Sequence, residues 1–292
     1  MYKHVSKLLH IFLLVTLLGT CGSSVYFISQ EPEVIHAAAF VPTPALSALS
    51  PLEATREPVH SAPEPGWSMV QPGLERREIP VFNGQNQQVE SLFIWRLDQK
   101  YFRMDVAYDE TPKSLETWQR DTNAAMVVNG GFYSIENEKY FPNGLTIVNG
   151  QPSGRSFNYG GMLAIHEDRA ELRWLVQRPF STSERLQAGL QSFPILVQPG
   201  GELGFGPERE NHASARRTVI GQDRAGRILL MVAPQGYFTL HQLSAYLTES
   251  DLGLDIAINL DGGGSTGILV ANPPEVISPT RLIPFVILVY AR

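Results

Sequence analysis

The sequence has little cysteine and no excess of positive charge. Cys21 is the only cysteine among 292 residues, so no disulfide bond can form within one chain and packing must hold the fold. Acidic residues outnumber basic ones, 29 to 23, giving a net charge of -6, and no long basic run is present. Nucleic-acid binders normally carry a positive face, so the composition argues against a nucleic-acid partner.

Histidine clusters and repeats are missing as well. His166, His212 and His241 are too widely spaced to predict a metal site. Neither an internal repeat nor a coiled-coil heptad pattern is found, which argues against solenoids and long helical rods. The apolar content of 43% is sufficient for one sizeable core.

The first 29 residues are typical of an export signal or an anchor. Lys3 and Lys7 precede an apolar run at residues 11–18. Three outcomes fit this segment: lipidation at Cys21 as in a bacterial lipoprotein, cleavage near the small residues 37–39, or retention as an uncleaved anchor, since apolar character resumes at 25–28. Each outcome predicts a domain exported to the periplasm or cell envelope, with the membrane contacted only through this segment.

Residues 30–74 contain eight prolines among scattered serine, alanine and glutamate. Proline removes backbone donors and restricts φ, and little apolar periodicity is left to form a core face. We therefore predict a disordered tether here, followed by a single catalytic domain over residues 75–292.

Strand signals dominate from residue 75 onward. Val89–Leu97 and Tyr101–Tyr108 are rich in β-branched and aromatic residues, and the short link at 98–100 predicts a hairpin. The continuous apolar run at 124–128 is typical of a strand buried on both faces. Further strands are predicted at 145–148, 161–165, 217–222, 227–233 and 254–260.

One helix is predicted to begin at Thr239 and to end at Gly253. Thr239 and Gln242 fit a capping box, and glycine commonly follows a helix C-terminus. Because hairpins alternate with strand-helix-strand units, we predict an α+β fold: a single domain with a mixed, mostly antiparallel sheet and flanking helices.

Two loops place a polar residue where a buried strand stops, and glycines follow at once. The residues are Asn129, Gly130 and Gly131 in the first loop and Asp261, Gly262, Gly263, Gly264 and Ser265 in the second. Glycine lets backbone N–H groups approach a ligand closely, and successive amides can form an anion site. Either loop alone could be a tight turn without a ligand, but two in one domain favour a binding site.

Two charged residues stand out beside these loops. Asp261 directly follows an apolar run, where a carboxylate is costly to bury unless it has a partner or a task, although it could also cap a turn. Arg217 begins a predicted strand and could bind a phosphate through two parallel hydrogen bonds.

Five motifs occur in an order that resembles the phosphodiester glycosidase family. They are Asn129–Phe132, Pro142–Gly144, Pro194–Val197, Arg217–Gly221 and Asn259–Ser265. The resemblance covers roughly residues 80 to 290 and implies hydrolysis of a sugar-1-phosphodiester, with a sugar-phosphate or glycan, for example of an exopolysaccharide, as substrate. It also implies that Asp261 and Arg217 are catalytic, and that Asn143 and the two glycine loops bind substrate. The family includes an animal enzyme with cysteine-rich extensions. This sequence has no such cysteine-rich segment, so the resemblance concerns the catalytic domain alone.

The sequence departs from the family pattern at two places. Arg216 and Arg217 form a doubled arginine, and the register of the following residues predicts that Arg217 meets the substrate while Arg216 points away. Tyr133 stands where many members have a second phenylalanine.

The implied reaction passes through an oxocarbenium-like transition state. Since phosphate is a fair leaving group, charge stabilisation should matter more than a strong general acid. Asp261 would act at the sugar carbon, as nucleophile or as base for water. The second carboxylate is left open among Glu136, Glu138 and Glu184. No cofactor is implied with certainty, and a divalent cation beside Asp261 is left open.

Two other functions fit parts of the sequence. Residues 263–267 match the glycine-any-serine-any-glycine elbow of serine hydrolases, which would make Ser265 a nucleophile. That elbow requires a following helix and a later histidine, whereas a strand is predicted after Gly267 and no histidine follows His241. A non-catalytic envelope protein that binds glycan or phosphate could use the same loops, because motifs do not report turnover.

Overall fold

The computed structural model describes residues 66–292, which contain twenty strands and two α-helices. The predicted export signal, the predicted lipidation site at Cys21 and most of the predicted tether lie outside the described residues. Within the described part, no helix is both long and apolar enough to cross a membrane.

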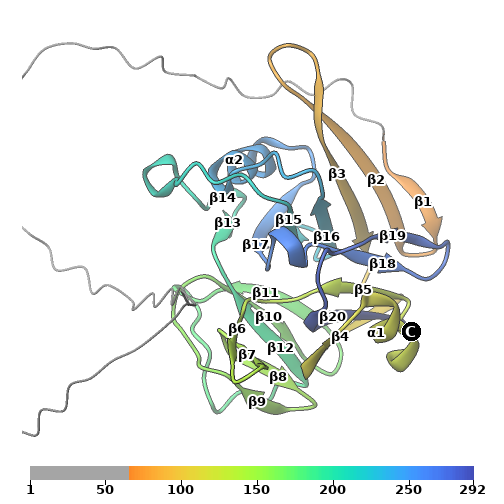
Figure 1. The fold of residues 1–292 in the computed structure, drawn as a ribbon, viewed down its shortest axis with the longest axis vertical. Helices are drawn as coiled ribbons and strands as arrows, with labels where there is room; N and C mark the ends of the chain where they lie inside the picture. Colours follow the sequence, from red (N-terminus) through yellow and green to blue (C-terminus); the bar gives the residue numbers. More distant parts are fainter. Residues whose placement is uncertain (1–65) are drawn as a thin grey trace, which may run out of the picture. The chain divides into compact units, whose positions relative to one another are not determined.

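The largest sheet has eight strands in the order β1-β2-β3-β16-β15-β17-β13-β14 (Figure 1). Their bounds are β1 Ser68–Gln71, β2 Leu74–Phe82, β3 Gln88–Leu97, β13 Ile195–Gln198, β14 Glu202–Leu203, β15 Arg217–Asp223, β16 Ile228–Ala233 and β17 Leu254–Asn259. Helix α2 (Leu240–Glu249) covers one face of this sheet, where Leu243 and Leu247 pack against Val219 and Met231. Short 3-10 turns occur at Pro207–Arg209 and Gly263–Ser265.

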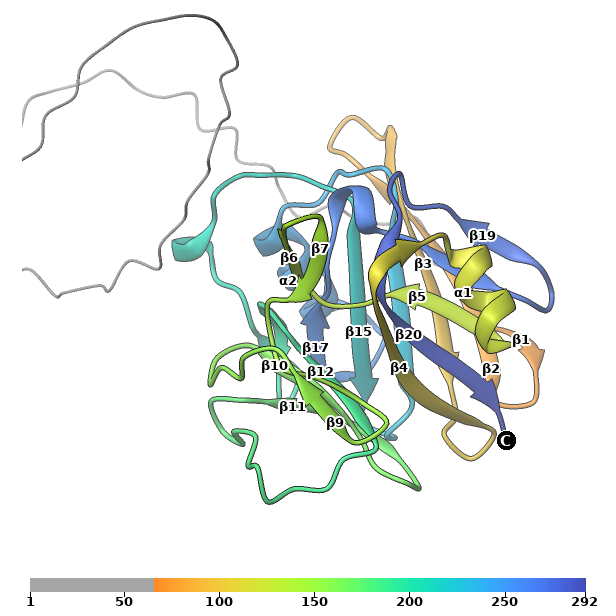
Figure 2. The same cartoon turned by 60° about the horizontal axis from the view of Figure 1, so that its bottom comes forward.

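Three smaller sheets complete the domain, in the orders β11-β10-β12-β8-β9, β19-β18-β5-β20-β4 and β6-β7. Their bounds are β4 Phe102–Lys113, β5 Met126–Asn129, β6 Tyr133–Glu136, β7 Lys139–Pro142, β8 Thr146–Val148, β9 Gln151–Ser153, β10 Gly161–Ile165, β11 Ala170–Trp174, β12 Ala188–Ser192, β18 Ile268–Val270, β19 Glu275–Ile277 and β20 Ile283–Ala291. Helix α1 (Leu115–Thr122) packs against β5 and β18, on the side of the molecule that Figure 2 turns forward.

The prediction of an α+β fold with flanking helices was wrong, because the domain is a β-rich assembly of antiparallel sheets. Every strand pair in the described part is antiparallel. The strand-helix-strand unit β16-α2-β17 suggested a parallel pair. In the structure β15 lies between β16 and β17 and is antiparallel to both, so the helix crosses over an intervening strand.

The hairpin predicted at Val89–Leu97 and Tyr101–Tyr108 does not form, although both strands exist. β3 pairs with β2 and β16, whereas β4 joins another sheet beside β20. Both edges of β3 are occupied by segments from elsewhere in the chain, so β4 must find its partner in a different sheet. The β15-β16 pair and the capping box of α2 were predicted correctly, but α2 ends at Glu249 and not at Gly253.

The folded domain also begins earlier than residue 75. β1 pairs with β2, and the Trp67 ring lies 3.7 Å from the guanidinium carbon of Arg96, in a cation-π contact. Leu74 is only 1% exposed. Residues 68–74, which the prediction placed in the tether, are therefore part of the fold. Pro72 sits in the turn between β1 and β2, where a missing N–H costs nothing to either strand.

The central core lies between the two five-stranded sheets and the face of the eight-stranded sheet that α2 does not cover. Ile258 of β17, Val128 of β5 and Leu190 of β12 meet there. This packing brings the ends of β5 and β17, and the glycine loops that follow them, to one place.

Candidate functional site

The two glycine loops are joined by hydrogen bonds through the main chain of Asp261. Its N–H donates to the Gly130 carbonyl at 3.0 Å, and its carbonyl accepts from Asn129 Nδ2 at 2.6 Å. Both sides of the Asp261 peptide are thus held by the loop after β5. The direction of the Asp261 side chain is therefore determined by a strand end from a different sheet.

Asn129 holds the site together from inside the protein. Its side chain is fully buried, and besides its bond to Asp261 it accepts at Oδ1 from Thr218 Oγ1 at 2.8 Å and from Gly267 N at 3.1 Å. One amide thereby ties four chain segments together. These bonds make Asn129 a positioning residue, and the substrate-binding role that the sequence predicted for it stays a prediction.

Each glycine after Asp261 has its own structural reason. A Cβ on Gly262 would lie 2.7 Å from the Arg216 carbonyl oxygen, Gly263 has a φ of +58°, and a Cβ on Gly264 would lie 2.5 Å from Arg281 Nε. Gly263 needs the left-handed region, which favours glycine, and its two neighbours need close approach. The loop can therefore pass between two arginines.

Three backbone amides of this loop are bonded within the protein. Gly263 N donates to Arg216 O at 2.8 Å, Gly262 N to Asp261 Oδ1 at 2.9 Å, and Ser265 N to Gly262 O at 3.1 Å. These three donors are therefore not available to a bound anion.

The Asp261 carboxylate is electrostatically unusual. Burial raises its pKa above the ordinary aspartate value, and this effect outweighs the opposing influence of the Ser265 hydroxyl, the Gly262 amide and the Arg281 charge. The Ser265 hydroxyl lies close enough to act on the carboxylate but outside hydrogen-bonding geometry. A partly desolvated carboxylate at a rigid strand end is a suitable base or nucleophile.

Arg281 is the cation whose charge acts on this carboxylate, and the sequence analysis missed it. It lies between β19 and β20 with an exposed side chain, next to the backbone of Gly264. Contact with the Tyr133 hydroxyl, and to a smaller extent the charge of Asp261, raises the pKa of Arg281. No motif marked this arginine. The nearest signals were Gly264, whose missing side chain makes room for it, and Tyr133, which was noted only as a departure from the family pattern.

The two residues of the doubled arginine have different partners. Arg217 begins β15, and its Nε donates to Phe238 O at 3.2 Å and its Nη2 to Ala213 O at 2.8 Å. Arg216 directly precedes β15; its Nη2 donates to Ser278 O at 2.9 Å and its carbonyl accepts from Gly263 N at 2.8 Å. The backbone of Arg216 thus contacts the Asp261 loop, and the catalytic role of Arg217 stays a prediction.

Four buried polar atoms in and beside the loop have no hydrogen-bond partner in the protein. They are Arg216 Nε, Asn259 Oδ1, Ser265 Oγ and Thr266 Oγ1. Buried polar atoms of native proteins are nearly always paired, so a group of unpaired ones needs an explanation. They come from the start of β15, the end of β17 and the end of the glycine loop, which are the segments gathered around Asp261.

The remaining predicted residues lie elsewhere. Asn143 is exposed in the turn after β7, and its N–H donates to Phe132 O at 3.0 Å. Glu136 and Glu138 are exposed at the tip of the β6-β7 hairpin. Ser265 is 1% exposed and is followed by strand β18, which is incompatible with the serine-hydrolase elbow that needs a helix there.

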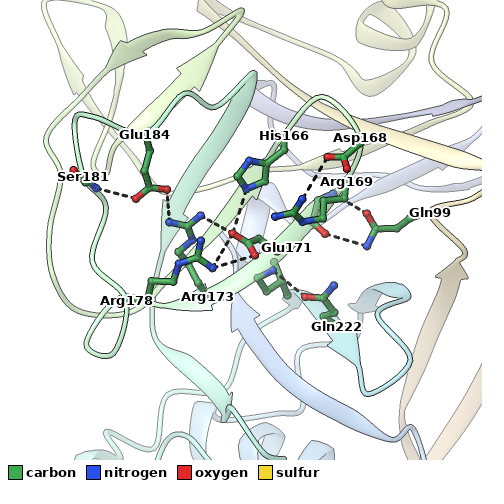
Figure 3. A network of polar contacts seen from close by, with 12 residues as sticks. Gln99, His166, Asp168, Arg169, Glu171, Arg173, Arg178, Ser181, Glu184 and Gln222 are labelled. Atoms are coloured by element: carbon green, nitrogen blue, oxygen red, sulfur yellow. Dashed lines mark hydrogen bonds and ion pairs between the residues drawn. The ribbon is translucent and has the colours of Figure 1, made fainter.

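Glu184 belongs to a separate ionic network on β11 and the loop that follows it (Figure 3). Its carboxylate accepts from Arg173 Nη1 at 2.6 Å and from Ser181 N at 3.0 Å. Arg173 also donates to Glu171 at 2.6 Å, and His166 lies 3.2 Å from the same carboxylate. Glu184 is thus engaged in ion pairing and does not serve as the second carboxylate of the site.

The described residues contain no cluster of ligands for the divalent cation that the sequence left open. Among residues 66–292, no group of three or more His, Cys, Asp or Glu side chains could hold a metal ion. Asp261 instead has a cation, Arg281, acting on its pKa. We derive no step through a metal.

Comparison with known proteins identifies the class of this site. The family model described as phosphodiester glycosidase matches residues 122–290, which include both glycine loops, Arg216 and Arg281. The chain belongs to the phosphodiester glycosidase family. No curated protein matches the chain.

Two solved structures share the fold. The first is the catalytic domain of zebrafish N-acetylglucosamine-1-phosphodiester alpha-N-acetylglucosaminidase, auto-inhibited by its pro-peptide. It is 15% identical, with a TM-score of 0.58 over 82% of this chain and 96% of that chain. The second is a hypothetical protein from Synechocystis, 14% identical, with a TM-score of 0.54 over 82% of this chain and 65% of that chain.

Proposed function

We propose that this protein hydrolyses the bond between the anomeric carbon of a sugar and a phosphodiester, acting on a glycan or exopolysaccharide-type substrate. The observation that carries the proposal is the placement of Asp261. Its carboxylate is partly desolvated at a strand end, its main chain is held by the Asn129–Gly131 loop, and Arg281 lies beside it. Membership of the phosphodiester glycosidase family supports the reaction class.

In the proposed reaction the bond from the anomeric carbon to the phosphate oxygen breaks, and its electron pair leaves on the phosphate. The oxygen of one water molecule becomes bonded to the anomeric carbon, and the proton of that water passes to Asp261 or to solvent. Asp261 acts in its ionised form by one of two routes. It attacks the anomeric carbon to form a glycosyl ester, which water then hydrolyses to release the sugar and the carboxylate, or it deprotonates the water that attacks the anomeric carbon directly. Both routes require the same carboxylate, so both predict loss of activity when it is protonated or neutralised.

Arginine side chains are proposed to stabilise the departing phosphate. Arg281 is exposed and its charge acts on Asp261, and Arg216 has a buried Nε without a protein partner. Guanidinium groups bind phosphate oxygens through directed, charge-assisted hydrogen bonds. Charge stabilisation of this kind can lower the barrier without a strong general acid, because the phosphate is already a fair leaving group.

The proposed location is the cell envelope. The support is the N-terminal sequence, in which basic residues precede an apolar run, as in export signals. Fractionation of a strain that produces the full chain, followed by immunoblotting, would test the location. Recovery in the cytoplasmic fraction would contradict it.

The reaction is tested with purified protein and a panel of sugar-1-phosphodiesters, with release of reducing sugar as the readout. Asp261→Asn should abolish turnover while substrate affinity is retained. A non-catalytic glycan or phosphate binder would give binding without turnover in the unmodified protein. That result, obtained across the whole panel, would contradict the proposed reaction.

A further inference from the structure

An aromatic cluster begins at the candidate site and extends outward to the surface. Phe132 stacks on Phe193 with ring centroids 4.7 Å apart, and Phe157 stacks on Tyr159 at 4.4 Å. Edge contacts join Phe193 to Phe157 at 5.8 Å and to Tyr159 at 5.7 Å. Phe132, Phe157 and Phe193 are half-buried, whereas Tyr159 is 57% exposed.

The inner end of this aromatic cluster is attached to both glycine loops. Phe132 directly follows Gly131 in the chain. The Phe193 carbonyl accepts from Asn259 Nδ2 at 3.1 Å, and Asn259 lies two residues before Asp261. The inner rings are therefore joined to the segments that carry the two glycine loops, so a molecule lying on the cluster would extend outward from the candidate site.

The outer end is a built structure and not a loose loop. Gln191 is 3% exposed, and its Oε1 accepts from Phe157 N at 2.9 Å while its Nε2 donates to Ser156 Oγ at 3.0 Å. Gly144 also abuts Phe157, since a Cβ there would lie 2.8 Å from the ring. The loop that carries Tyr159 is thus held by a buried polar side chain, and Tyr159 is presented to solvent by a rigid support.

We propose that this aromatic cluster is a sugar-binding subsite for an oligosaccharide substrate, with Tyr159 stacking against a pyranose ring beyond the one at the scissile bond. One face of a pyranose carries several C–H groups and packs well on an aromatic ring, while its hydroxyls stay in water. A large exposed aromatic ring that continues a functional site is a typical binding surface. The inference rests on the proposed function for the identity of the substrate, but binding of the sugar does not require turnover.

The subsite gives the Asn143-Gly144 turn a supporting role that needs no catalytic side chain. Gly144 packs against the Phe157 ring, and the Asn143 N–H donates to Phe132 O, so the turn supports two members of the aromatic cluster. The motif that resembled the family therefore shapes the subsite through its backbone.

The test is binding of neutral oligosaccharides, measured by calorimetry and by saturation-transfer NMR. The probes are maltotetraose, cellotetraose, chitotetraose and mannotetraose, none of which carries a phosphate. We expect saturable binding of at least one probe, with roughly tenfold or greater loss of affinity in Tyr159→Ala, as for truncation of an aromatic anchor. Tyr159→Phe should retain binding, because the ring and not the hydroxyl makes the contact.

Tyr101→Ala is the matched control, since Tyr101 is 40% exposed and its ring lies against Gly73 and Lys100, away from this aromatic cluster. It should bind the probe as the unmodified protein does. Unchanged thermal melting of Tyr159→Ala would show that the variant is folded. Absence of binding to all four probes at millimolar concentration, or equal affinity in Tyr159→Ala, would overturn the subsite. Absence of phosphodiester turnover by the unmodified protein would contradict only the proposed reaction.

Discussion

Asn129 Nδ2 donates to the main-chain carbonyl of Asp261 at 2.6 Å, which links a strand end of one sheet to the candidate catalytic residue at the end of another. The two residues are 132 positions apart in the sequence. We therefore expect substitution of Asp261 to affect chemistry and substitution of Asn129 to affect the stability of the site.

Asp261→Asn should lower kcat by about 10²–10⁴-fold, the usual contribution of a positioned acid-base group. The asparagine can still accept from Gly262 N, so the loop should keep its shape. Asp255→Asn is the control on β17, the strand that leads to Asp261, since the Asp255 carboxylate accepts from Gly200 N. Equal losses in the two variants, measured by steady-state kinetics, would contradict a specific role for Asp261.

Asn129→Ala should destabilise the domain by about 2–4 kcal/mol, because it leaves buried donors unpaired as well as removing hydrogen bonds. Thr218→Val removes one of the same hydrogen bonds and should cost less, about 1 kcal/mol. Urea unfolding of both variants checks the order. A larger effect for Thr218→Val would mean that Asn129 is not the centre of the network.

Arg281→Gln should lower kcat/KM for a phosphodiester by about 10–100-fold, since one charge-assisted hydrogen bond contributes about 1.5–3 kcal/mol. Arg216→Gln should also reduce activity, because Arg216 lies beside the Asp261 loop. Arg217→Gln should act mainly on stability, because its guanidinium donates to Phe238 and Ala213 carbonyls. A greater kinetic loss in Arg217→Gln than in Arg281→Gln would restore the assignment made from the sequence.

The raised pKa of Asp261 predicts a pH dependence of activity and of stability. Activity should fall as the pH drops through this raised pKa. For stability the folded state binds the proton more tightly than the unfolded state, so the contribution of this group to the free energy of unfolding falls as the pH rises through the same range. Asp261→Asn should therefore melt at a higher temperature than the unmodified protein near neutral pH, with a smaller difference in acid. An advantage that is largest in acid would contradict the sign of the shift.

The N-terminal boundary predicts a difference between two truncations. A chain beginning at Gly66 retains β1 and Trp67, whereas one beginning at Pro72 loses both the edge strand and the contact of Trp67 with Arg96. The shorter chain should be less stable by about 1–3 kcal/mol, from lost apolar burial and the cation-π contact. Equal urea midpoints would show that β1 adds nothing to the fold.

The sequence by itself determined the features that depend on local chemistry. The capping residues of α2, the β15-β16 hairpin and the buried strand before Asn129 follow from side chains within a few positions of one another. The motif order was enough to identify the phosphodiester glycosidase family, and the two glycine loops were recognised as the place where buried strands stop.

Only the tertiary structure decided which segments meet. β4 does not pair with β3 because β2 and β16 occupy both edges of β3, so β4 pairs with β20 in another sheet. The residues near β3 in the sequence give no indication that both of its edges are occupied. The roles of Arg216 and Arg217 depend on which face of β15 meets the Asp261 loop, and a strand's period of two reverses this choice with a shift of one residue. The charge of Arg281 acts on Asp261 although no motif marks Arg281, because the approach of distant segments follows from the packing of whole sheets and not from neighbouring residues in the chain.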